Sequence, residues 1–207
     1  MAGETIGQLA ENIGTPLDRL LLQIEEAGLP QRAADDAISE NEKVERIRYT
    51  TSHPRDMTDD LIDCYSNNKK LMPFVHLPIQ SGSDRMLNLM NRKHTVDDYI
   101  KVYEKLKNIN KDIEFSSDFI IGYPGETDKD FNDTLNLIKK VGFINSFSFI
   151  FSPRPGTPAA NLNQINIEES KKRLILFQKI SEKIKKEYRE KLLYKETEVL
   201  FENKTKN

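Results

Sequence analysis

Polar side chains and glycines follow three apolar, β-prone runs of this chain, where they can form a rim around a ligand. The first segment, Gln80-Ser81-Gly82-Ser83, combines an amide, two hydroxyls and a glycine. Such groups hydrogen-bond a ribose or a carboxylate, and a glycine lets the backbone approach the ligand. The alternative is an ordinary strand-to-helix turn in which Ser83 caps the next helix.

Two later segments have the same character. Gly122-Tyr123-Pro124-Gly125-Glu126 has the glycine content of a loop over a phosphate or an adenine, but it contains neither GxGxxG nor a Walker lysine. A tight strand-to-helix turn is the alternative. The proline-rich segment Ser152–Pro158 can present Arg154 to an anion such as phosphate. A solvent-facing arginine is the alternative there.

Residue types that bind metals or act as nucleophiles are few. The three histidines, His53, His76 and His94, have neither helical nor CxxC-like spacing, so the sequence predicts no metal site. The single cysteine, Cys64, falls inside a helical stretch, where we expect a small buried hydrophobe. We therefore predict no catalytic residue and no metal ligand.

Alternating strands and helices position these loops from about Val44 onward. The predicted strands are Arg46–Thr51, Phe74–Ile79, Ile113–Ile121 and Ser146–Phe151. The predicted helices are Thr58–Asn67, Asp84–Asn91, Thr95–Asn108, Thr127–Val141 and Ile167–Lys191. This order predicts an α/β fold with a parallel sheet, whose carboxyl edge gathers the loops. About four strands do not close a barrel, which needs about eight, so we expect that part of the fold is missing.

The first 43 residues have a different, helical pattern. Thr5–Asn12 is a short helical stretch, and a second helix starts with Thr15 as its cap and Pro16 at its first position. Its apolar stripe consists of Leu17, Leu20, Leu21 and Ile24. Ser39 and Glu42 form a capping-box pattern for another helix. A unit this small must close a mini-core or dock on a partner.

Composition narrows the class of protein. The 207 residues carry a net charge of −2, so no global basic field indicates nucleic-acid binding. The basic stretch Lys171–Lys195 is interpreted as a solvated helix face, with an RNA-contacting face as the alternative. One cysteine, no signal-peptide pattern and no long apolar run predict a cytoplasmic protein without a membrane partner.

Four segments together carry a resemblance to a known family. They are Arg46–Pro54 (RIRYTTSHP), His76–Ser83 (HLPIQSGS), Ser117–Glu126 (SDFIIGYPGE) and Phe149–Ala159 (FIFSPRPGTPA). From about Val44 to Asn207 the chain resembles the methylthiotransferase family of radical S-adenosylmethionine enzymes. Within that family it is most similar to enzymes that methylthiolate isopentenyl-adenosine beside the tRNA anticodon. The resemblance implies a partial (βα) barrel of the radical SAM type, with S-adenosylmethionine and two four-iron four-sulfur clusters as cofactors and tRNA as partner.

The resemblance also implies site residues. Its cofactor-binding candidates are Gln80, Ser81, Asp118, Ile120, Gly122, Phe151 and Arg154. Each family cluster needs three thiolates, because soft sulfur ligands suit iron, and this chain has only Cys64. The cluster-binding loop and the first barrel strands are absent from these residues. We therefore expect neither cluster in this chain, and no activity from it.

The amino-terminal segment is similar to a different protein. Residues Thr5–Ala10, Thr15–Leu20 and Glu26–Gly28, with Ala34–Asp36 and Ser39, resemble the small amino-terminal domain of bacterial translation initiation factor 2. The predicted domains are thus residues 1–43, a radical SAM barrel fragment over 44–192, and the start of a TRAM-like RNA-binding β-barrel over 193–207. Such a chimera can arise by engineering, by rearrangement or as an assembly artefact.

These observations give two functional hypotheses, and a third reading is a non-functional fragment, which would show as aggregation or poor thermal cooperativity. The first is a fragment of a tRNA-modifying radical SAM methylthiotransferase that is inactive as it stands. The second is a non-catalytic tRNA- or ribosome-binding module, in which residues 1–43 contact the ribosome or a translation factor.

Overall fold

The computed structural model describes residues 5–12, 16–26, 33, 46–48 and 53–196. The chain divides into two compact units, Met1–Ile47 and Arg48–Asn207. This division lies close to the predicted boundary after residue 43, while the identity of each predicted domain stays a prediction. Residues 197–207, which include most of the segment predicted to begin a TRAM-like β-barrel, lie outside the described residues.

The first unit contains two helices, α1 (Ile6–Asn12) and α2 (Leu17–Glu26). The apolar contact between them joins Ile6, Ala10, Leu17 and Leu21. This is a mini-core of the predicted kind, built on part of the predicted stripe. The side chains of Leu20 and Ile24, and the helix start predicted at Ser39, lie outside the described residues.

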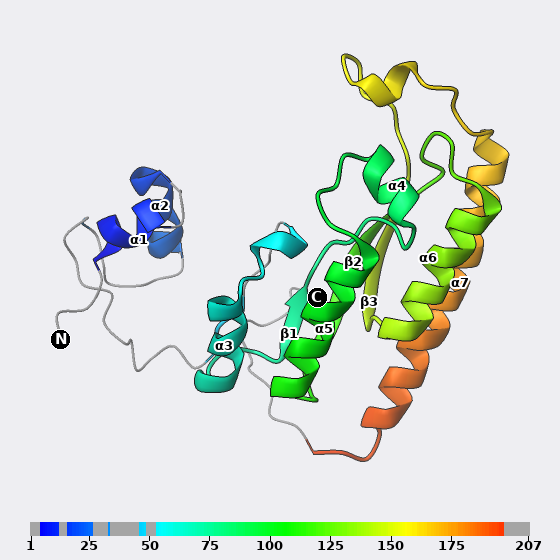
Figure 1. Ribbon diagram of the computed structural model, residues 1–207. Coiled ribbons are helices and arrows are strands. Elements are labelled where there is room, and N and C mark those ends of the chain that lie inside the picture. The colour runs from blue at the N-terminus through cyan, green and yellow to red at the C-terminus, as the bar shows by residue number, and fades with distance from the viewer. Residues whose placement is uncertain (1–4, 13–15, 27–32, 34–45, 49–52, 197–207) are drawn as a thin grey trace, which may run out of the picture. The chain divides into compact units, whose positions relative to one another are not determined.

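The second unit alternates helices and strands in the predicted order (Figure 1). Its elements are the 3-10 turn η1 (Pro54–Asp56), α3 (Asp59–Asn67), β1 (Phe74–His76), α4 (Asp84–Leu89), α5 (Val96–Ile109), β2 (Glu114–Ile121), α6 (Asp128–Val141), β3 (Asn145–Ile150), the 3-10 turn η2 (Pro158–Asn161) and α7 (Ile167–Leu192). The three strands form one parallel sheet in the order β1-β2-β3. The predicted α/β class is confirmed.

One predicted strand is shorter in the structure, and another is only partly described. The strand β1 ends at His76 instead of Ile79. Pro78 has no N–H to donate to a ladder, which explains why regular pairing stops before it. Pairing resumes only as a single bridge between Gln80 and Phe119. The predicted first strand, Arg46–Thr51, runs into residues 49–52, which are outside the described part.

Local capping explains where the main helices begin. Thr95 and Thr127 each close a capping box with the aspartate three residues later, Asp98 and Asp130. Ser83 caps α4 by accepting a hydrogen bond from the Met86 N–H. The helices α4 and α6 therefore start directly after the first two loops with candidate binding residues.

The hydrophobic core lies on one face of the sheet. Val75, Phe115, Phe119 and Ile121 point into it, and each is at most 1% exposed. The helices α5, α6 and α7 cover this face with Tyr99, Leu106, Phe131, Ile138 and Phe177. The Phe119 and Phe177 rings lie 4.8 Å apart between centroids. The sheet is thus anchored to its helices from one side.

The position of Cys64 corrects a prediction. Its side chain is exposed on α3, where the Sγ–H donates weakly to the Asp60 carbonyl at 3.3 Å. Ile62 and Tyr65 occupy the buried side of that helix. The expected buried role was wrong because the helical phase of α3 places position 64 toward solvent. None of the described helices is long and apolar enough to cross a membrane.

Candidate functional site

The second face of the sheet carries polar and aromatic side chains and is only partly covered by the described elements. In β2 the residues Ser116, Asp118 and Ile120 alternate with the core residues and face this side. The strand register places Asp118 beside Phe147 and Ile120 beside Phe149. These two phenylalanines are 46% and 57% exposed. We call this surface the open sheet face.

His76, on the outer strand β1, lies on the open sheet face and is oriented by a hydrogen bond at one ring nitrogen. Its Nδ1 hydrogen-bonds with the Ser116 Oγ at 2.7 Å, and its Nε2 lies 3.6 Å from the Asp118 Oδ2. The Phe147 ring meets the imidazole edge-on, with 6.0 Å between centroids. An imidazole oriented in this way can bind a polar ligand.

The sequence analysis considered His76 only as a metal ligand and missed this arrangement. Its partners are on a strand about forty residues later, so no local spacing links them. The parallel register, which sets His76 opposite Ser116, creates the group.

The first rim loop is largely occupied by contacts within the protein. Ser81 is 1% exposed, and its Oγ lies 3.3 Å from the Thr134 Oγ1 while accepting from the Ser83 N–H. Gly82 donates its N–H to the same Thr134 hydroxyl at 2.9 Å. Gln80 is 8% exposed and has a φ of 78°, in the left-handed region. The predicted capping role of Ser83 is confirmed.

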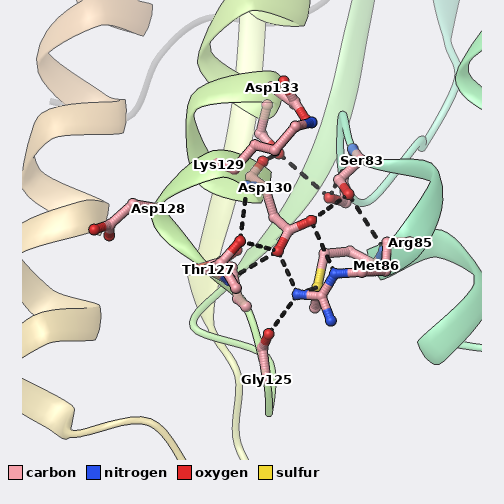
Figure 2. A network of polar contacts seen from close by, with 12 residues as sticks. Ser83, Arg85, Met86, Gly125, Thr127, Asp128, Lys129, Asp130 and Asp133 are labelled. Carbon is pink, nitrogen blue, oxygen red and sulfur yellow. Dashed lines mark hydrogen bonds and ion pairs between the residues drawn. The ribbon is translucent and has the colours of Figure 1, made fainter.

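A buried carboxylate joins this loop to α6, as Figure 2 shows. The Asp130 Oδ1 accepts from the Ser83 hydroxyl at 2.6 Å and from the Arg85 Nε at 3.2 Å. Its Oδ2 accepts from the Thr127 N–H at 2.8 Å and from an Arg85 Nη2. Burial acts to raise the pKa of Asp130, but the bonds from Arg85, Ser83 and Thr127 outweigh it and hold that pKa well below its usual range.

The second rim loop is anchored to α7. The Gly122 N–H donates to the Glu126 Oε2 at 3.0 Å, and Arg173 reaches the same oxygen at 2.9 Å. A Cβ on Gly122 would meet the Ser170 Oγ at 2.3 Å, and its φ is 72°. Only glycine fits there, because the backbone conformation and the close helix both exclude a side chain. Gly122 therefore has a packing role that does not depend on a ligand.

The third rim loop begins with Phe151 and is the most exposed. The Phe151 ring packs edge-on against Tyr123, with 4.8 Å between centroids. Arg154 is exposed, and its carbonyl accepts from the Thr157 N–H and hydroxyl at 3.2 Å and 2.8 Å. Arg154 therefore lies in a turn, and its guanidinium faces solvent.

Hydrogen bonds and packing between the loops hold all three at one edge of the sheet. The Arg85 Nη2 donates to the Gly125 carbonyl at 2.5 Å, and the Tyr123 hydroxyl donates to the Leu89 carbonyl at 3.1 Å. In Figure 1 the segment between β3 and α7 lies at the same end of the unit as α4. The structure thus gathers the predicted loops, although Ser81 and Gly122 are buried in packing while Asp118, Ile120 and Arg154 are accessible.

The residues present do not fit an iron–sulfur cluster. The 207-residue sequence holds one cysteine, Cys64, which lies on α3 and not in any of the rim loops. The described residues contain no group of three or more His, Cys, Asp or Glu side chains arranged to hold a metal ion. A cluster with three thiolate ligands therefore cannot be built from these residues.

The chain matches the model of a known protein family. The sequence profile of the Radical SAM superfamily matches residues 10–138. This range covers more than half of the chain and begins inside the first unit. The resemblance of residues 1–43 to an initiation factor stays a prediction.

Curated relatives are similar over about four fifths of the chain. A tRNA-2-methylthio-N(6)-dimethylallyladenosine synthase from Pelagibacter ubique is 61% identical over 168 residues, covering 80% of this chain and 37% of the relative. The protein of the same description from Wolbachia pipientis wMel is 48% identical over 168 residues, covering 81% and 38%. The chain thus spans less than two fifths of the length of these relatives.

A solved structure shares the fold. Coproporphyrinogen III oxidase (HemN) from Escherichia coli, described as a radical SAM enzyme, superposes with a TM-score of 0.53 at 15% identity. The superposition covers 64% of this chain and 31% of that one.

Proposed function

Because this chain belongs to the radical SAM superfamily, we propose that it is the strand-and-helix core of a tRNA methylthiotransferase. The observation that carries this proposal is the 61% identity to a tRNA-2-methylthio-N(6)-dimethylallyladenosine synthase over 168 residues. The substrate position is then the isopentenyl-adenosine beside the tRNA anticodon. The relatives are more than twice as long, so the complete activity requires residues beyond these 207.

The open sheet face is the proposed site for S-adenosylmethionine. It offers what an adenosyl and amino-acid ligand requires: the partly exposed carboxylate of Asp118, the oriented imidazole of His76 and the apolar surface of Ile120 with the neighbouring phenylalanines. Gln80, Ser81, Gly122 and Phe151 hold the rim around this face, and Arg154 is the accessible cation of the third loop. In this superfamily S-adenosylmethionine supplies an adenosyl group for radical chemistry.

The chain itself would bind and orient the ligand. Asp118 accepts hydrogen bonds from donors on the ligand, and His76, held by Ser116, fixes a second polar group. The exposed faces of Phe147 and Phe149 exclude water from the apolar part of the ligand. No step that requires a cluster follows from these residues, and we propose that the isolated chain does not catalyse methylthiolation.

Two measurements on the full chain test this proposal. Titration calorimetry with S-adenosylmethionine should show binding that Asp118→Ala weakens roughly tenfold, because a charge-assisted hydrogen bond is lost. Asp97→Ala is the matched control, since Asp97 is exposed on α5 and pairs with Lys101 on the same helix. Equal affinity of both variants for S-adenosylmethionine would show that Asp118 does not contact the ligand.

The second measurement addresses catalysis. After anaerobic reconstitution with iron and sulfide, we expect no stoichiometric cluster and no methylthiolated nucleoside in digested tRNA. A complete relative such as the Pelagibacter enzyme serves as positive control. A stoichiometric cluster in the 207-residue chain would overturn the proposed inactivity.

The alternative, a non-catalytic tRNA- or ribosome-binding module, depends on the basic helix α7. Several of its lysines pair with glutamates one turn away on the same helix, as in Lys183–Glu187 and Lys186–Glu190. This pairing lowers the net positive field that phosphates would meet and favours a solvated face. Salt-sensitive tRNA binding without S-adenosylmethionine binding would instead favour the module.

A further inference from the structure

His94 is an unusual buried residue outside the open sheet face. It is 6% exposed, and neither ring nitrogen has a hydrogen-bond partner among the described residues. The Ile79 backbone lies near enough to influence its pKa, but not with the geometry of a hydrogen bond. Buried polar atoms are nearly always paired, so such an atom calls for a specific cause, such as a bound ion.

A hollow of about 330 Å³ adjoins this imidazole. It is lined by Pro54, Arg55, Met57, Lys93, His94, Asp98 and Val102. These residues come from η1, the connection between α4 and α5, and the first half of α5. Arg55 and Lys93 therefore bring two positive charges to one hollow from separate segments of the chain.

The charges around the hollow favour an anion. Arg92 is a third cation close enough to act on both His53 and His94. The opposing acids are Asp56, which acts on His53, and Asp98, which acts on His94. Among the residues that line the hollow itself, two basic side chains, Arg55 and Lys93, accompany one acidic side chain, Asp98.

The nearer acid is already engaged. The Asp98 carboxylate accepts from the Thr95 N–H at 2.9 Å and from the Thr95 hydroxyl at 2.8 Å. These bonds satisfy one oxygen within the capping box of α5 but leave the carboxylate its negative charge, so Asp98 offsets one of the two cations that line the hollow. An added anion would meet a net positive surface.

His53 covers His94 from one side. Its ring meets the His94 ring edge-on, with 4.9 Å between centroids, and its Nδ1 accepts from the Arg55 N–H at 3.2 Å. In this arrangement solvent does not reach the His94 nitrogens. A ligand that binds these nitrogens must therefore displace part of what buries them, which includes the His53 ring.

We propose that this hollow binds a phosphate-class anion between Arg55 and Lys93, with the His94 imidazole donating an N–H to it. The anion is either a free phosphate, including that of a nucleotide, or a phosphodiester of RNA. Guanidinium, ammonium and imidazolium are the side chains that recognise phosphate oxygens. None of these residues belongs to the open sheet face or its rim, so this inference is independent of the proposed function.

Nuclear magnetic resonance of the histidine rings in the full chain tests the proposal directly. The chain has only three histidines, so His53→Gln, His76→Gln and His94→Gln variants assign every ring signal. Inorganic phosphate should move the His94 ring signals and raise the pKa of His94, whereas sodium chloride at equal ionic strength should not. The His76 signals serve as the internal reference.

Substitutions of the cations sharpen the test. Arg55→Gln and Lys93→Gln should each weaken phosphate binding roughly tenfold, because each removes a charge-assisted hydrogen bond. Lys101→Gln, on the exposed side of α5 where Lys101 pairs with Asp97, should leave it unchanged. Equal affinity in Arg55→Gln, Lys93→Gln and Lys101→Gln would overturn the proposed contacts.

A short single-stranded oligoribonucleotide distinguishes the two sources of phosphate. A response of His94 to the oligonucleotide at lower concentration than to free phosphate would assign the site to RNA. A response to free phosphate alone would assign it to a small anion. No response to either, with the ring signals unchanged, would overturn the proposal and leave the S-adenosylmethionine site untouched.

Discussion

The Arg173 Nη1 donates to the Glu126 Oε2 at 2.9 Å and to the Glu126 carbonyl at 3.1 Å, and thereby fixes the second rim loop to α7. The two side chains are 9% and 1% exposed. Burial raises the pKa of Glu126, while the bonds from Arg173 and from the Gly122 N–H act in the opposite direction. The loop depends on this pair because neither charge can be solvated where it lies.

Replacing the arginine should destabilise the fold strongly. We expect Arg173→Met to lower the free energy of unfolding by about 3–5 kcal/mol, because Glu126 is left buried and unpaired. Urea denaturation followed by circular dichroism measures the change. The control is Lys183→Met, whose lysine is 76% exposed on the same helix and should matter little.

The double variant Glu126→Gln/Arg173→Met then separates the charge from the packing. It should be more stable than Arg173→Met alone, since the unpaired carboxylate is removed. A double variant as unstable as the single one would show that lost packing, and not the buried charge, explains the effect.

The Asp130 carboxylate should make stability depend on acid pH. Its pKa in the folded chain is held below its usual range, so its contribution is present above about pH 4 and is lost as the pH falls further. We expect Asp130→Asn to cost about 2 kcal/mol at pH 7, since bonds to a buried charge are weakened. The difference from the wild type should narrow below about pH 4. Urea midpoints at several pH values measure it, and a difference that is constant with pH would contradict this role.

Asp97→Asn is the matched control for that series. Asp97 is 73% exposed and pairs with Lys101 one turn away on α5. Its replacement should leave both the stability and its pH dependence close to the wild type.

Gly82 should not tolerate a side chain. An alanine Cβ at this position would lie 2.6 Å from the Thr134 Cα and 2.7 Å from the Asp133 carbonyl oxygen. These are backbone atoms of α6, so relief requires the loop and the helix to separate. We expect Gly82→Ala to cost about 1–3 kcal/mol and to lower the thermal midpoint.

Gly142→Ala provides a comparison without a clash. A Cβ there meets no atom within 4 Å, and only the φ of 71° opposes it. The Gly142→Ala substitution should lower the free energy of unfolding by about 1 kcal/mol. If Gly82→Ala were the milder of the two substitutions, the tight contact with α6 would be refuted.

The buried His94 should weaken the fold as the pH falls. Burial lowers its pKa, and His53 and Arg92 lower it further, against Asp98 and the Ile79 backbone. The unfolded chain therefore takes up a proton near pH 6.5 that the folded chain resists, so stability should fall between about pH 7.5 and 5.5.

Urea unfolding in phosphate-free buffer measures how steeply the free energy of unfolding falls as the pH is lowered. His94→Leu should make this fall less steep, whereas His76→Gln should leave it unchanged. His53 has a lowered pKa for the same leading reason and contributes in the same direction, so His53→Gln should flatten it in part. A slope unchanged in His94→Leu would assign the pH dependence to other groups.

Much of the fold follows from interactions within a few residues. Thr95 with Asp98, and Thr127 with Asp130, form capping boxes over three positions, so the starts of α5 and α6 were predictable. The alternation along β2 likewise places Asp118 and Ile120 on the face opposite Phe119, because side chains in a strand change sides at each residue. Local geometry determines these features, and the sequence encodes it directly.

Only the tertiary structure decided what the remaining residues contact. Asp130 meets Ser83 and Arg85, which lie 47 and 45 residues away, and His76 meets Ser116, which lies 40 residues away. The exposure of Cys64 and the isolation of His94 also depend on which elements pack against them. The sequence thus determined the family, the order of elements and the missing thiolates. The parallel crossovers, which join distant segments through helices, decided which polar groups meet, because no local spacing contains that information.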